Sequence, residues 1–241
     1  MIIFVTGETD YIGETLIKEG LQLGHELIVL TNSKNKAYQL ILQGAHPIIG
    51  DLLEYGDWQS ILKEVDAVIH LAAPPPVGEK VTEKVALDYA DRHLQLTKRL
   101  FDVVNPGKVK KIIYVGGTSY YGDSGNGASC DETNHSLPNG WGPYIAPSIE
   151  YARSKAKEYP VMIVSPAQIY GTSSWMEQLF LEPMYLGKPI TSLNGYNPYF
   201  SPIDIEDCGR ACIHLIEYGE MGEQYIHGQS ADRFNELSLR N

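Results

Sequence analysis

The segment from Val5 to Gly13 could bind a phosphate group. It reads Val-Thr-Gly-Glu-Thr-Asp-Tyr-Ile-Gly, so Gly7 follows an apolar run and a helix pattern opens at Tyr11 or Ile12. A strand that turns at a glycine into a helix leaves unpaired backbone N–H groups, and the positive end of the helix dipole, at one point. We therefore predict that the pyrophosphate of a dinucleotide binds at this turn.

The end of the second predicted strand would decide which dinucleotide is preferred. It reads Leu30-Thr31-Asn32-Ser33-Lys34 and has no carboxylate to hold the ribose hydroxyls of NAD(H) or to repel a 2′-phosphate. All four polar side chains of this stretch can donate hydrogen bonds to such a phosphate. The sequence therefore favours NADP(H) over NAD(H).

Short apolar runs separated by helix-length segments must position these residues. The runs lack polar alternation, which is typical of strands buried on both faces. They lie at 2–5, 27–30, 46–49, 67–71, 111–115 and 161–164, and segments with helical spacing lie at 12–23, 35–43, 58–63, 82–104, 144–158 and 205–218. This alternation predicts an α/β fold, a Rossmann-type doubly wound parallel sheet whose ligands bind at the carboxyl ends of the strands.

The remaining segments complete the domain organisation. Gly, Asn, Ser, Asp and Pro predominate from Gly122 to Pro143, which predicts a long surface loop. A short strand is expected around Tyr225. We assign residues 1–171, with about 201–220, to a Rossmann dinucleotide-binding core, and residues 172–200 and 221–241 to a small C-terminal substrate-binding appendage.

Composition excludes several classes of partner. With 19 basic and 30 acidic residues, the net charge of −11 opposes binding to nucleic acid and to anionic lipid. No apolar run approaches the roughly 18 residues that a membrane span requires, and the short apolar start is a strand rather than a signal peptide. Three cysteines, at 130, 208 and 212, favour a reducing cytoplasm and buried structural thiols over disulfides or metal ligands. We expect a cytoplasmic protein without metal.

Several further motifs follow the turn in a fixed order. They are Gly50-Asp51-Leu52, His70-Leu71-Ala72-Ala73, Tyr114-Val115 with Tyr121-Gly122, Ser165-Pro166-Ala167-Gln168-Ile169-Tyr170-Gly171, and Ile203-Asp204-Ile205-Glu206-Asp207. Together with the turn they span residues 1 to about 228. In this set the chain resembles the extended short-chain dehydrogenase/reductase family, which contains nucleotide-sugar epimerases, dehydratases and related reductases.

The resemblance implies a set of cofactor contacts. Asp51 and Leu52 would approach the adenine ring, Leu71 to Ala73 the adenosine ribose, and Pro166 to Ile169 the nicotinamide carboxamide. The alternative is that these strand-end residues serve packing alone. The residues assigned to the cofactor are Gly7, Thr9, Asp10, Tyr11, Ile12, Gly13, Thr31, Asn32, Ser33, Asp51, Leu52, Leu71, Ala72, Ala73, Val115, Pro166 and Ile169.

Asp10 departs from the family pattern, because it stands where the family has the second glycine of its turn. A carboxylate adds bulk and charge repulsion against the phosphates. Asp10 either caps the helix or rotates away from the cofactor. Both alternatives predict that cofactor binding is weakened or lost.

The resemblance also implies a reaction centre made of a Tyr, a Lys four residues later and an earlier Ser or Thr. In the family the Tyr passes a proton to or from the substrate oxygen, the Lys holds the nicotinamide ribose and makes the Tyr more acidic, and the hydroxyl orients the substrate carbonyl. Tyr144 lies where the helix should begin, but Ser148 replaces the Lys. Tyr151 and Lys155 have the full spacing, yet they lie two turns, roughly 10 Å, farther from the strand ends. We therefore prefer Tyr144 and keep Tyr151 as the alternative.

The hydroxyl partner is altered too. Gly117 occupies the usual Ser or Thr position, and the Gly116-Gly117 pair gives the backbone unusual freedom. Thr118 or Ser119 could reach a substrate oxygen, or both could merely satisfy backbone groups of a turn. The candidate catalytic residues are therefore Tyr144, Thr118, Ser119 and Ser148.

These substitutions shape the predicted reaction. Without a neighbouring cation Tyr144 should be a poor base at neutral pH, yet it could donate a proton to a developing alkoxide, which makes carbonyl reduction easier than oxidation. No Arg occurs between Arg153 and Arg210, which argues against a nucleotide diphosphate substrate. Aromatic and apolar residues that could line a pocket are Trp141, Trp175, Met176, Leu179, Phe180, Tyr185, Tyr196 and Tyr199.

We predict an NAD(P)H-dependent oxidoreductase that acts on a carbonyl or hydroxyl of a small, rather apolar metabolite, with reduction favoured. By the resemblance, a homodimer would form through the helices at 82–104 and 144–158. Two alternatives stay open. One is a non-redox isomerase, lyase or cyclase on the same scaffold, and the other is a catalytically silent dinucleotide-binding sensor.

Overall fold

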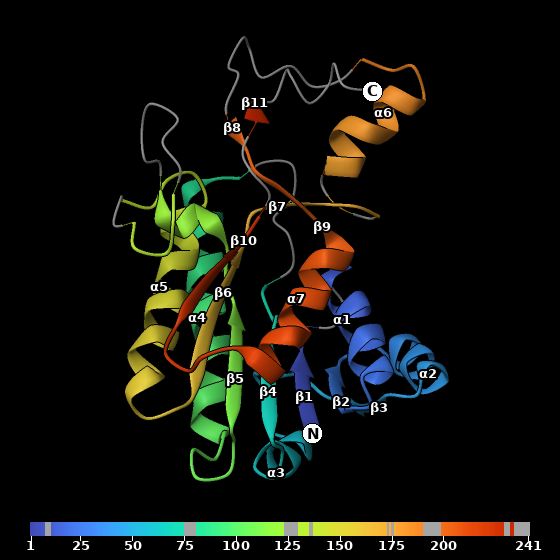
Figure 1. The fold of residues 1–241 in the computed structure, drawn as a ribbon, viewed down its shortest axis with the longest axis vertical. Helices are drawn as coiled ribbons and strands as arrows, with labels where there is room; N and C mark the ends of the chain where they lie inside the picture. Colours follow the sequence, from blue (N-terminus) through green and yellow to red (C-terminus); the bar gives the residue numbers. More distant parts are fainter. Residues whose placement is uncertain are drawn as a thin grey trace.

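A seven-stranded parallel sheet forms the centre of the molecule (Figure 1). The structure, a computed structural model, describes residues 1–7, 11–74, 81–122, 130–134, 137–172, 174, 176–189, 199–228 and 232–233. The strand order is β10-β6-β5-β4-β1-β2-β3, and every neighbouring pair is parallel. The predicted Rossmann-type α/β fold is confirmed.

The elements alternate along the chain as predicted. The sheet contains β1 (Ile2–Thr6), β2 (Glu26–Thr31), β3 (His46–Ile49), β4 (Ala67–His70), β5 (Lys111–Val115), β6 (Val161–Pro166) and β10 (Gln224–His227). The helices against it are α1 (Tyr11–Gln22), α2 (Lys34–Gln43), α3 (Trp58–Leu62), α4 (Glu83–Val103), α5 (Gly142–Ser154) and α7 (Ile205–Tyr218). Short helical turns follow β5, as η1 (Thr118–Tyr121), and α5, as η2 (Lys155–Lys157). Among the described residues every helix is too short or too polar to cross a membrane.

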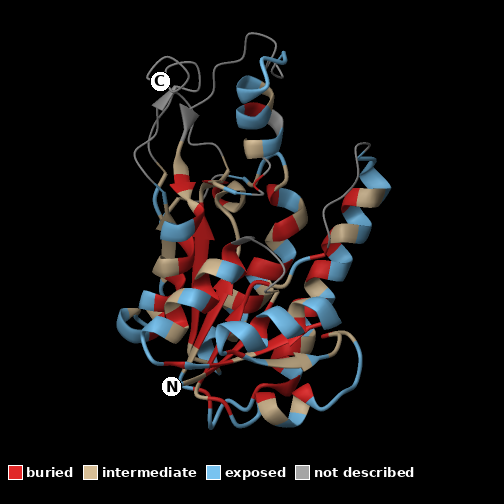
Figure 2. Ribbon diagram, turned by 90° about the vertical axis from the view of Figure 1, so that its right-hand side faces the viewer, coloured by how far each residue is buried: buried red, intermediate tan, exposed pale blue. Residues whose placement is uncertain are grey.

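Two hydrophobic cores flank the sheet, and this explains why the strands are apolar throughout. Alternate residues of one strand enter opposite cores, as Val5 enters one and Phe4 the other. The first core lies under α1 and α7, and the second lies under α3, α4 and α5. Figure 2 shows the buried residues concentrated along the strands and on the inner sides of the helices. A strand covered on both faces gains from apolar side chains at every position.

Four short strands and one helical segment lie above the carboxyl ends of the strands of the main sheet (Figure 1). The strands are β7 (Gln168–Tyr170), which pairs with β9 (Pro202–Asp204), and β8 (Tyr199–Phe200), which pairs with β11 (Asp232–Arg233). A π-helical turn η3 (Glu177–Leu181) runs into α6 (Glu182–Tyr185).

The strand expected around Tyr225 joins the main sheet. Residues 224–227 form β10, which pairs in parallel with β6, whereas the sequence analysis grouped residues 221–241 with the appendage. Backbone groups at the edge of β6 need hydrogen-bonding partners, and the returning chain supplies them. The core therefore extends beyond the predicted residue 220 to include this strand.

A cluster of polar side chains is buried under the centre of the sheet. His70 Nδ1 lies 2.7 Å from Thr6 Oγ1, and Tyr114 Oη lies 3.4 Å from His93 Nε2. His70 is 1% exposed and His93 5% exposed. Burial lowers the pKa of His70 to about 3, with a smaller contribution from nearby His93, and burial lowers the pKa of His93 to about 4. Both imidazoles are therefore neutral in the folded protein at neutral pH.

These histidines predict a loss of stability in mild acid. In the unfolded chain both have pKa values near 6.5, so below that pH the unfolded state binds protons that the folded state does not. The free energy of unfolding should fall as the pH drops from about 6.5 toward 4, by about 2 to 3 kcal/mol between pH 7.5 and pH 5.5. Urea denaturation at the two pH values measures this difference.

A pair of variants separates the cluster from other groups. His93→Gln should remove about half of the difference, and His214→Gln, at an exposed site on α7, should leave it in place. Equal free energies of unfolding at the two pH values in the unmodified protein would contradict the assignment.

Candidate active site

The carboxyl ends of β1 and β4 meet at the turn that was predicted to bind phosphate. Gly7 has φ +81°, and a Cβ on it would lie 2.4 Å from the backbone nitrogen of Ala72. The Leu71 N–H donates to the Thr6 carbonyl at 2.9 Å. Only glycine permits this approach, because a side chain at Gly7 would overlap the backbone of β4's continuation. The structure thus brings Gly7, Leu71 and Ala72 together.

The turn leads into a helix end that faces the same edge of the sheet. α1 begins at Tyr11, and Ile12 and Gly13 are buried in its first turn. Thr9 and Asp10, both assigned to the cofactor, lie outside the described residues. A helix that begins directly beyond a parallel strand presents its free N–H groups to a ligand at the strand end.

The ends of β2 and β3 lie beside each other. The Gly50 N–H donates to the Thr31 carbonyl at 2.9 Å, and Asp51 Oδ1 accepts a bond from the Leu53 N–H at 2.8 Å. Leu52 is buried, so its side chain serves packing.

The polar residues after β2 are partly engaged by the backbone. Thr31 Oγ1 accepts a bond from the Ser33 N–H at 3.1 Å, and Ser33 Oγ accepts one from the Lys36 N–H at 3.3 Å, which caps α2. Both hydroxyls use an acceptor in these bonds and keep an O–H donor. Asn32 is exposed between them. Thr31 is buried, so the accessible donors at this strand end are those of Asn32, Ser33 and Lys34.

The end of β5 differs from what its two glycines suggested. Gly117 has φ −169°, an extended conformation that any residue adopts, and a Cβ there would only touch Ile145 Cδ1 at 3.5 Å. Thr118 and Ser119 are half-buried in η1. The glycine freedom expected at Gly117 is therefore not used, and a serine would fit there.

Gly142 joins η1 to the start of α5. A Cβ on Gly142 would lie 2.1 Å from the Ser119 carbonyl oxygen, so the two backbones are in direct contact. This contact places the first turn of α5 beside η1. Tyr144 in that turn is therefore brought toward Thr118 and Ser119 of η1. The structure thus gathers these three candidate catalytic residues at the carboxyl end of β5, and their roles stay a prediction.

The two candidate tyrosines occupy different levels of α5. Tyr144 lies in the first turn, half-buried, with its ring 5.1 Å from the Trp141 ring. Tyr151 packs farther down the helix, its ring 6.1 Å from Phe101 near the end of α4 and 5.4 Å from Lys155 Nζ. Because α4 ends toward the amino edge of the sheet, Tyr151 lies away from the strand ends. This arrangement supports the preference for Tyr144.

Ser148 points into the protein interior. It is fully buried, it belongs to the side of α5 that faces α4, and its hydroxyl lies beside Tyr114. Burial raises the pKa of Tyr114, and the hydrogen bond with Thr97 lowers it to a smaller extent. Sequence reasoning missed this polar cluster of Tyr114, Thr97 and His93, since nothing in the chain showed that α4 and α5 press these residues together.

The nicotinamide end of the predicted site lies where β5 and β6 finish. Val115 pairs with Val164 in register, Pro166 is buried at the end of β6, and Ile169 is buried in β7. Ala73 is exposed beyond β4. The structure brings Val115, Pro166 and Ile169 to one edge, with Ala72 and Ala73 following the neighbouring strand β4.

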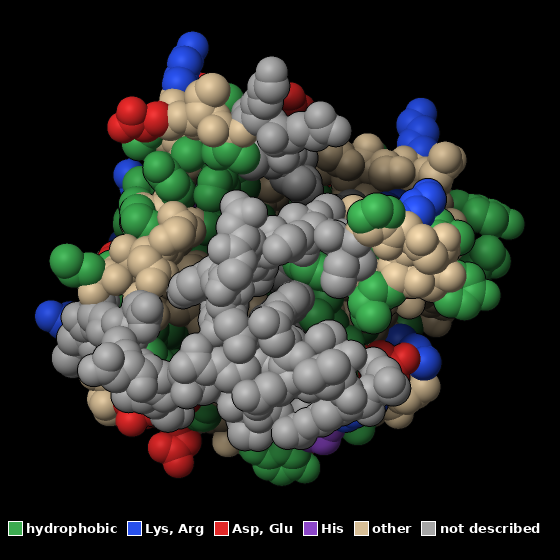
Figure 3. All heavy atoms as spheres, turned by 90° about the horizontal axis from the view of Figure 1, so that it is seen from above, with side chains coloured by type: hydrophobic (Ala, Val, Ile, Leu, Met, Phe, Trp, Pro, Cys, Tyr) green, Lys and Arg blue, Asp and Glu red, His purple; other side chains and the backbone are tan. Residues whose placement is uncertain are grey.

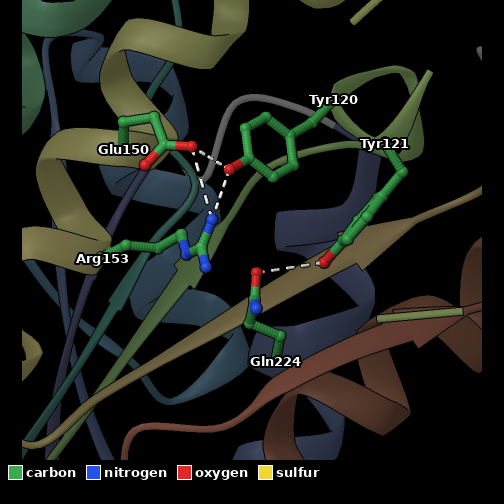
Figure 4. A network of polar contacts seen from close by, with 5 residues as sticks. All are labelled: Tyr120, Tyr121, Glu150, Arg153 and Gln224. Atoms are coloured by element: carbon green, nitrogen blue, oxygen red, sulfur yellow. Dashed lines mark hydrogen bonds and ion pairs between the residues drawn. The ribbon is translucent and has the colours of Figure 1, made fainter. Parts of the chain in front are cut away.

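A cavity of about 270 Å³ lies beside α5, on the side of the helix that carries Glu150 and Arg153. Ala146, Glu150 and Arg153 line it from α5, and Tyr120, Tyr121 and Gln224 line it from η1 and β10. Arg153 Nη1 donates to Tyr120 Oη at 2.5 Å and lies 3.4 Å from Glu150, while Tyr120 Oη donates to Glu150 (Figure 4). Tyr121 Oη donates to Gln224 Oε1 at 3.3 Å. These polar groups pair with one another. Their contacts connect α5 to η1, and η1 to the edge strand β10.

Figure 3 looks onto the face above the strand ends. Around the residues drawn in grey it shows hydrophobic and other uncharged groups, with both basic and acidic side chains toward the rim. Cys208 and Cys212 are buried free thiols in α7, and Cys130 is a half-buried free thiol. Among the described residues no group of His, Cys, Asp or Glu could hold a metal ion.

The aromatic residues expected to line a pocket separate in the structure. Trp141 contacts Tyr144, Phe180 is buried in η3, and Tyr185 is exposed on α6. Trp175 and Tyr196 lie outside the described residues, as do the side chains of Leu179 and Tyr199. Trp141 is thus the member of this set that the structure places beside a candidate catalytic residue.

Comparison with known proteins gives a family and several relatives. A sequence model described as the NAD dependent epimerase/dehydratase family matches residues 3–228. The UDP-glucose 4-epimerase of Klebsiella pneumoniae is 32% identical over 132 residues, which cover 51% of this chain and 94% of that protein. That of Bacillus subtilis is 33% identical over 132 residues, covering 51% of this chain and 38% of that protein. The UDP-glucose 4-epimerase of Yersinia enterocolitica is 25% identical over 218 residues, which cover 87% of this chain and 56% of that protein. The matches to the last two span about half or less of their lengths.

Solved structures share the fold at low identity. UDP-glucuronic acid 4-epimerase from Bacillus cereus, in complex with UDP-glucuronic acid and NAD, has a TM-score of 0.82 and 19% identity, and the match covers 100% of this chain and 84% of that one. The dTDP-glucose 4,6-dehydratase from Bacillus anthracis, in complex with NAD, has a TM-score of 0.79 and 19% identity, covering 99% and 79%.

Restoring the lysine of the Tyr-x3-Lys pattern should destabilise the protein. Ser148→Lys would place an ammonium group in a fully buried site beside Tyr114, where burial of an unpaired charge costs several kcal/mol. We expect the free energy of unfolding to fall by about 2 kcal/mol or more. Chemical denaturation measures it.

Ser154→Lys is the matched control, because Ser154 is exposed on the same helix. It should change stability by about 0.5 kcal/mol or less. A Ser148→Lys variant as stable as the Ser154→Lys variant would show that the side chain at 148 can leave the core.

Proposed function

The chain belongs to the NAD dependent epimerase/dehydratase family, and from this premise we propose that it is an NAD(P)H-dependent oxidoreductase acting on a carbonyl or hydroxyl of a small, rather apolar metabolite. The resemblance to the extended short-chain dehydrogenase/reductase family is thereby confirmed. The observation that carries the proposal is the different burial of Tyr144 and Ser148, which lie one turn apart on the same side of α5. Tyr144 lies half-buried in the first turn of α5, whereas Ser148 is directed into the core.

The residues at the centre of the sheet fit a dinucleotide. Gly7 lets the turn approach the end of β4, and the free N–H groups of α1 face the same edge. Asp51 at the end of β3 would lie on the adenine side, with Val115, Pro166 and Ile169 on the nicotinamide side. A bound nicotinamide supplies or accepts a hydride. The accessible donors of Asn32, Ser33 and Lys34 support a preference for the 2′-phosphorylated form.

Tyr144 would act as the proton donor. Its hydroxyl would give a proton to the oxygen of a substrate carbonyl as negative charge develops there, and Thr118 or Ser119 in η1 would orient that oxygen. With Ser148 buried, α5 places no cation four residues after Tyr144 to favour the phenolate that oxidation needs. Proton donation, and hence reduction, is therefore favoured.

The charge around the site supports an apolar substrate. The relatives named above are UDP-glucose epimerases, whose substrates carry a diphosphate. In this chain Lys188 is the sole basic residue between Lys157 and Arg210, and it is exposed beyond α6. A diphosphate is usually held by Arg or Lys. A small carbonyl compound next to Trp141 and Tyr144 therefore fits the site better.

The homodimer through α4 and α5 stays a prediction. The two helices pack side by side on one face of the sheet and so form a continuous surface.

The cofactor proposal predicts tighter binding of NADPH than of NADH. Charge-assisted hydrogen bonds from the residues after β2 to a 2′-phosphate should give about a tenfold difference in dissociation constant, measured by fluorescence titration. Ser33→Asp should reverse the preference, because an aspartate can still cap α2 but repels the phosphate. Absence of binding by either dinucleotide would favour the non-redox alternative.

The catalytic proposal predicts that Tyr144→Phe lowers turnover at least about tenfold, because the variant has no proton to donate. NADPH oxidation on a panel of small carbonyl compounds measures this, with UDP-glucose as the test for a sugar-nucleotide substrate. Tyr151→Phe is the control, since its ring packs against Phe101 away from the strand ends. Near-unchanged rates in Tyr144→Phe would place the chemistry elsewhere, and dinucleotide binding without turnover on any compound would favour the sensor.

A further inference from the structure

Three aromatic rings from two helices meet beside the first turn of α5. The centroid of the Tyr144 ring lies 5.1 Å from that of Trp141, with the planes inclined by 50°. The Trp141 ring lies 5.0 Å from the Tyr89 ring of α4, nearly edge-on at 66°. All three residues are half-buried. The contacts therefore form a short chain of rings that runs from α4 to the candidate proton donor.

The backbone of the first turn of α5 is fixed, but the helix does not set the direction of the Tyr144 side chain. Pro143 suits the start of a helix, because a backbone N–H at that position would have no partner within the helix. The Tyr144 N–H donates to the Trp141 carbonyl at 3.0 Å, which fixes the backbone. The phenol can still turn about its side-chain bonds. A contact with the ring itself must set its direction.

Ser148 does not supply that contact, because its side chain is fully buried beside Tyr114. The Trp141 ring supplies that contact, and the Tyr89 ring packs against Trp141. Tyr89 also lies 5.8 Å from the His93 ring, and His93 Nε2 is 3.4 Å from Tyr114 Oη in the core. The indole is thus held between rigid core groups on one side and the Tyr144 ring on the other.

We propose that Trp141 is a positioning residue for Tyr144. Its ring holds the phenol toward the carboxyl ends of the strands, where the substrate oxygen would lie, and Tyr89 fixes the indole in turn. Trp141 carries no charge, so it does not replace the lysine that the family has at the position of Ser148. The inference rests on the proposed role of Tyr144 as proton donor.

Trp141→Leu tests the inference, because leucine keeps apolar volume but removes the ring. An aromatic pair is worth a factor of about two to ten beyond its buried area, so kcat should fall by about that factor. The KM for the carbonyl compound and the dissociation constant of NADPH should stay within about twofold, since the variant leaves the residues assigned to the cofactor unchanged. Trp141→Phe, which keeps a ring, should retain most of the wild-type kcat. Tyr89→Leu should lower kcat in the same direction by a smaller factor.

A spectroscopic measurement makes the test independent of turnover. In protein with isotope-labelled tyrosine rings, the Tyr144 signal is the one that Tyr144→Phe removes, and its order parameter should fall in Trp141→Leu. Tyr38→Leu, at an exposed tyrosine on α2, is the control and should change neither kcat nor this order parameter.

The outcomes separate the two proposals. An unchanged kcat and an unchanged Tyr144 order parameter in Trp141→Leu would overturn the positioning role. A wild-type protein that reduces no carbonyl compound would defeat the proposed function, and the order parameter would still decide whether Trp141 holds the ring. If Trp141→Leu does not fold, Trp141→Phe and Tyr89→Leu carry the test: a positioning role requires the second to lower the order parameter more than the first.

Discussion

The close approach of two backbones at the centre of the sheet governs the rest of the structure. β1 ends at Gly7, whose positive φ and missing side chain allow contact with the backbone at Leu71 and Ala72. The Thr6–His70 hydrogen bond joins the same two strands one step earlier. Strand order reverses here, since β2 follows β1 on one side and β4 adjoins it on the other. The helices α1 and α4 consequently leave to opposite faces, and in sheets of this kind ligands bind at such a point of reversal.

The two sides of α5 make different contacts. The side that carries Tyr144, Ser148 and Tyr151 faces α4 and continues into aromatic and buried polar groups. The side that carries Glu150 and Arg153 braces the helix through Tyr120. A helix fixed on both sides holds its first turn at a constant height above the sheet. The Tyr144 side chain in that turn contacts the Trp141 ring.

The buried cluster below the site keeps its surroundings neutral. His70, His93 and Tyr114 are uncharged at neutral pH, because burial disfavours the charged form of each. Ser148 adds a hydroxyl to this cluster where a lysine would have added a charge.

The sequence by itself determined the fold and the location of the candidate site. Apolar runs such as 2–5 and 161–164 predicted strands buried on both faces, and Gly7 with the following helix predicted the phosphate-binding end, because these signals are local. Tertiary structure alone decided the rest. It showed that Gly117 is extended rather than specially bent, and that residues 224–227 belong to the main sheet. It also showed that Ser148 lies beside Tyr114, and that Tyr144 contacts Trp141, which in turn contacts Tyr89. These features arise from contacts between α4, α5 and β5, and the spacing of residues within one helix does not reveal which neighbour each side of that helix will meet.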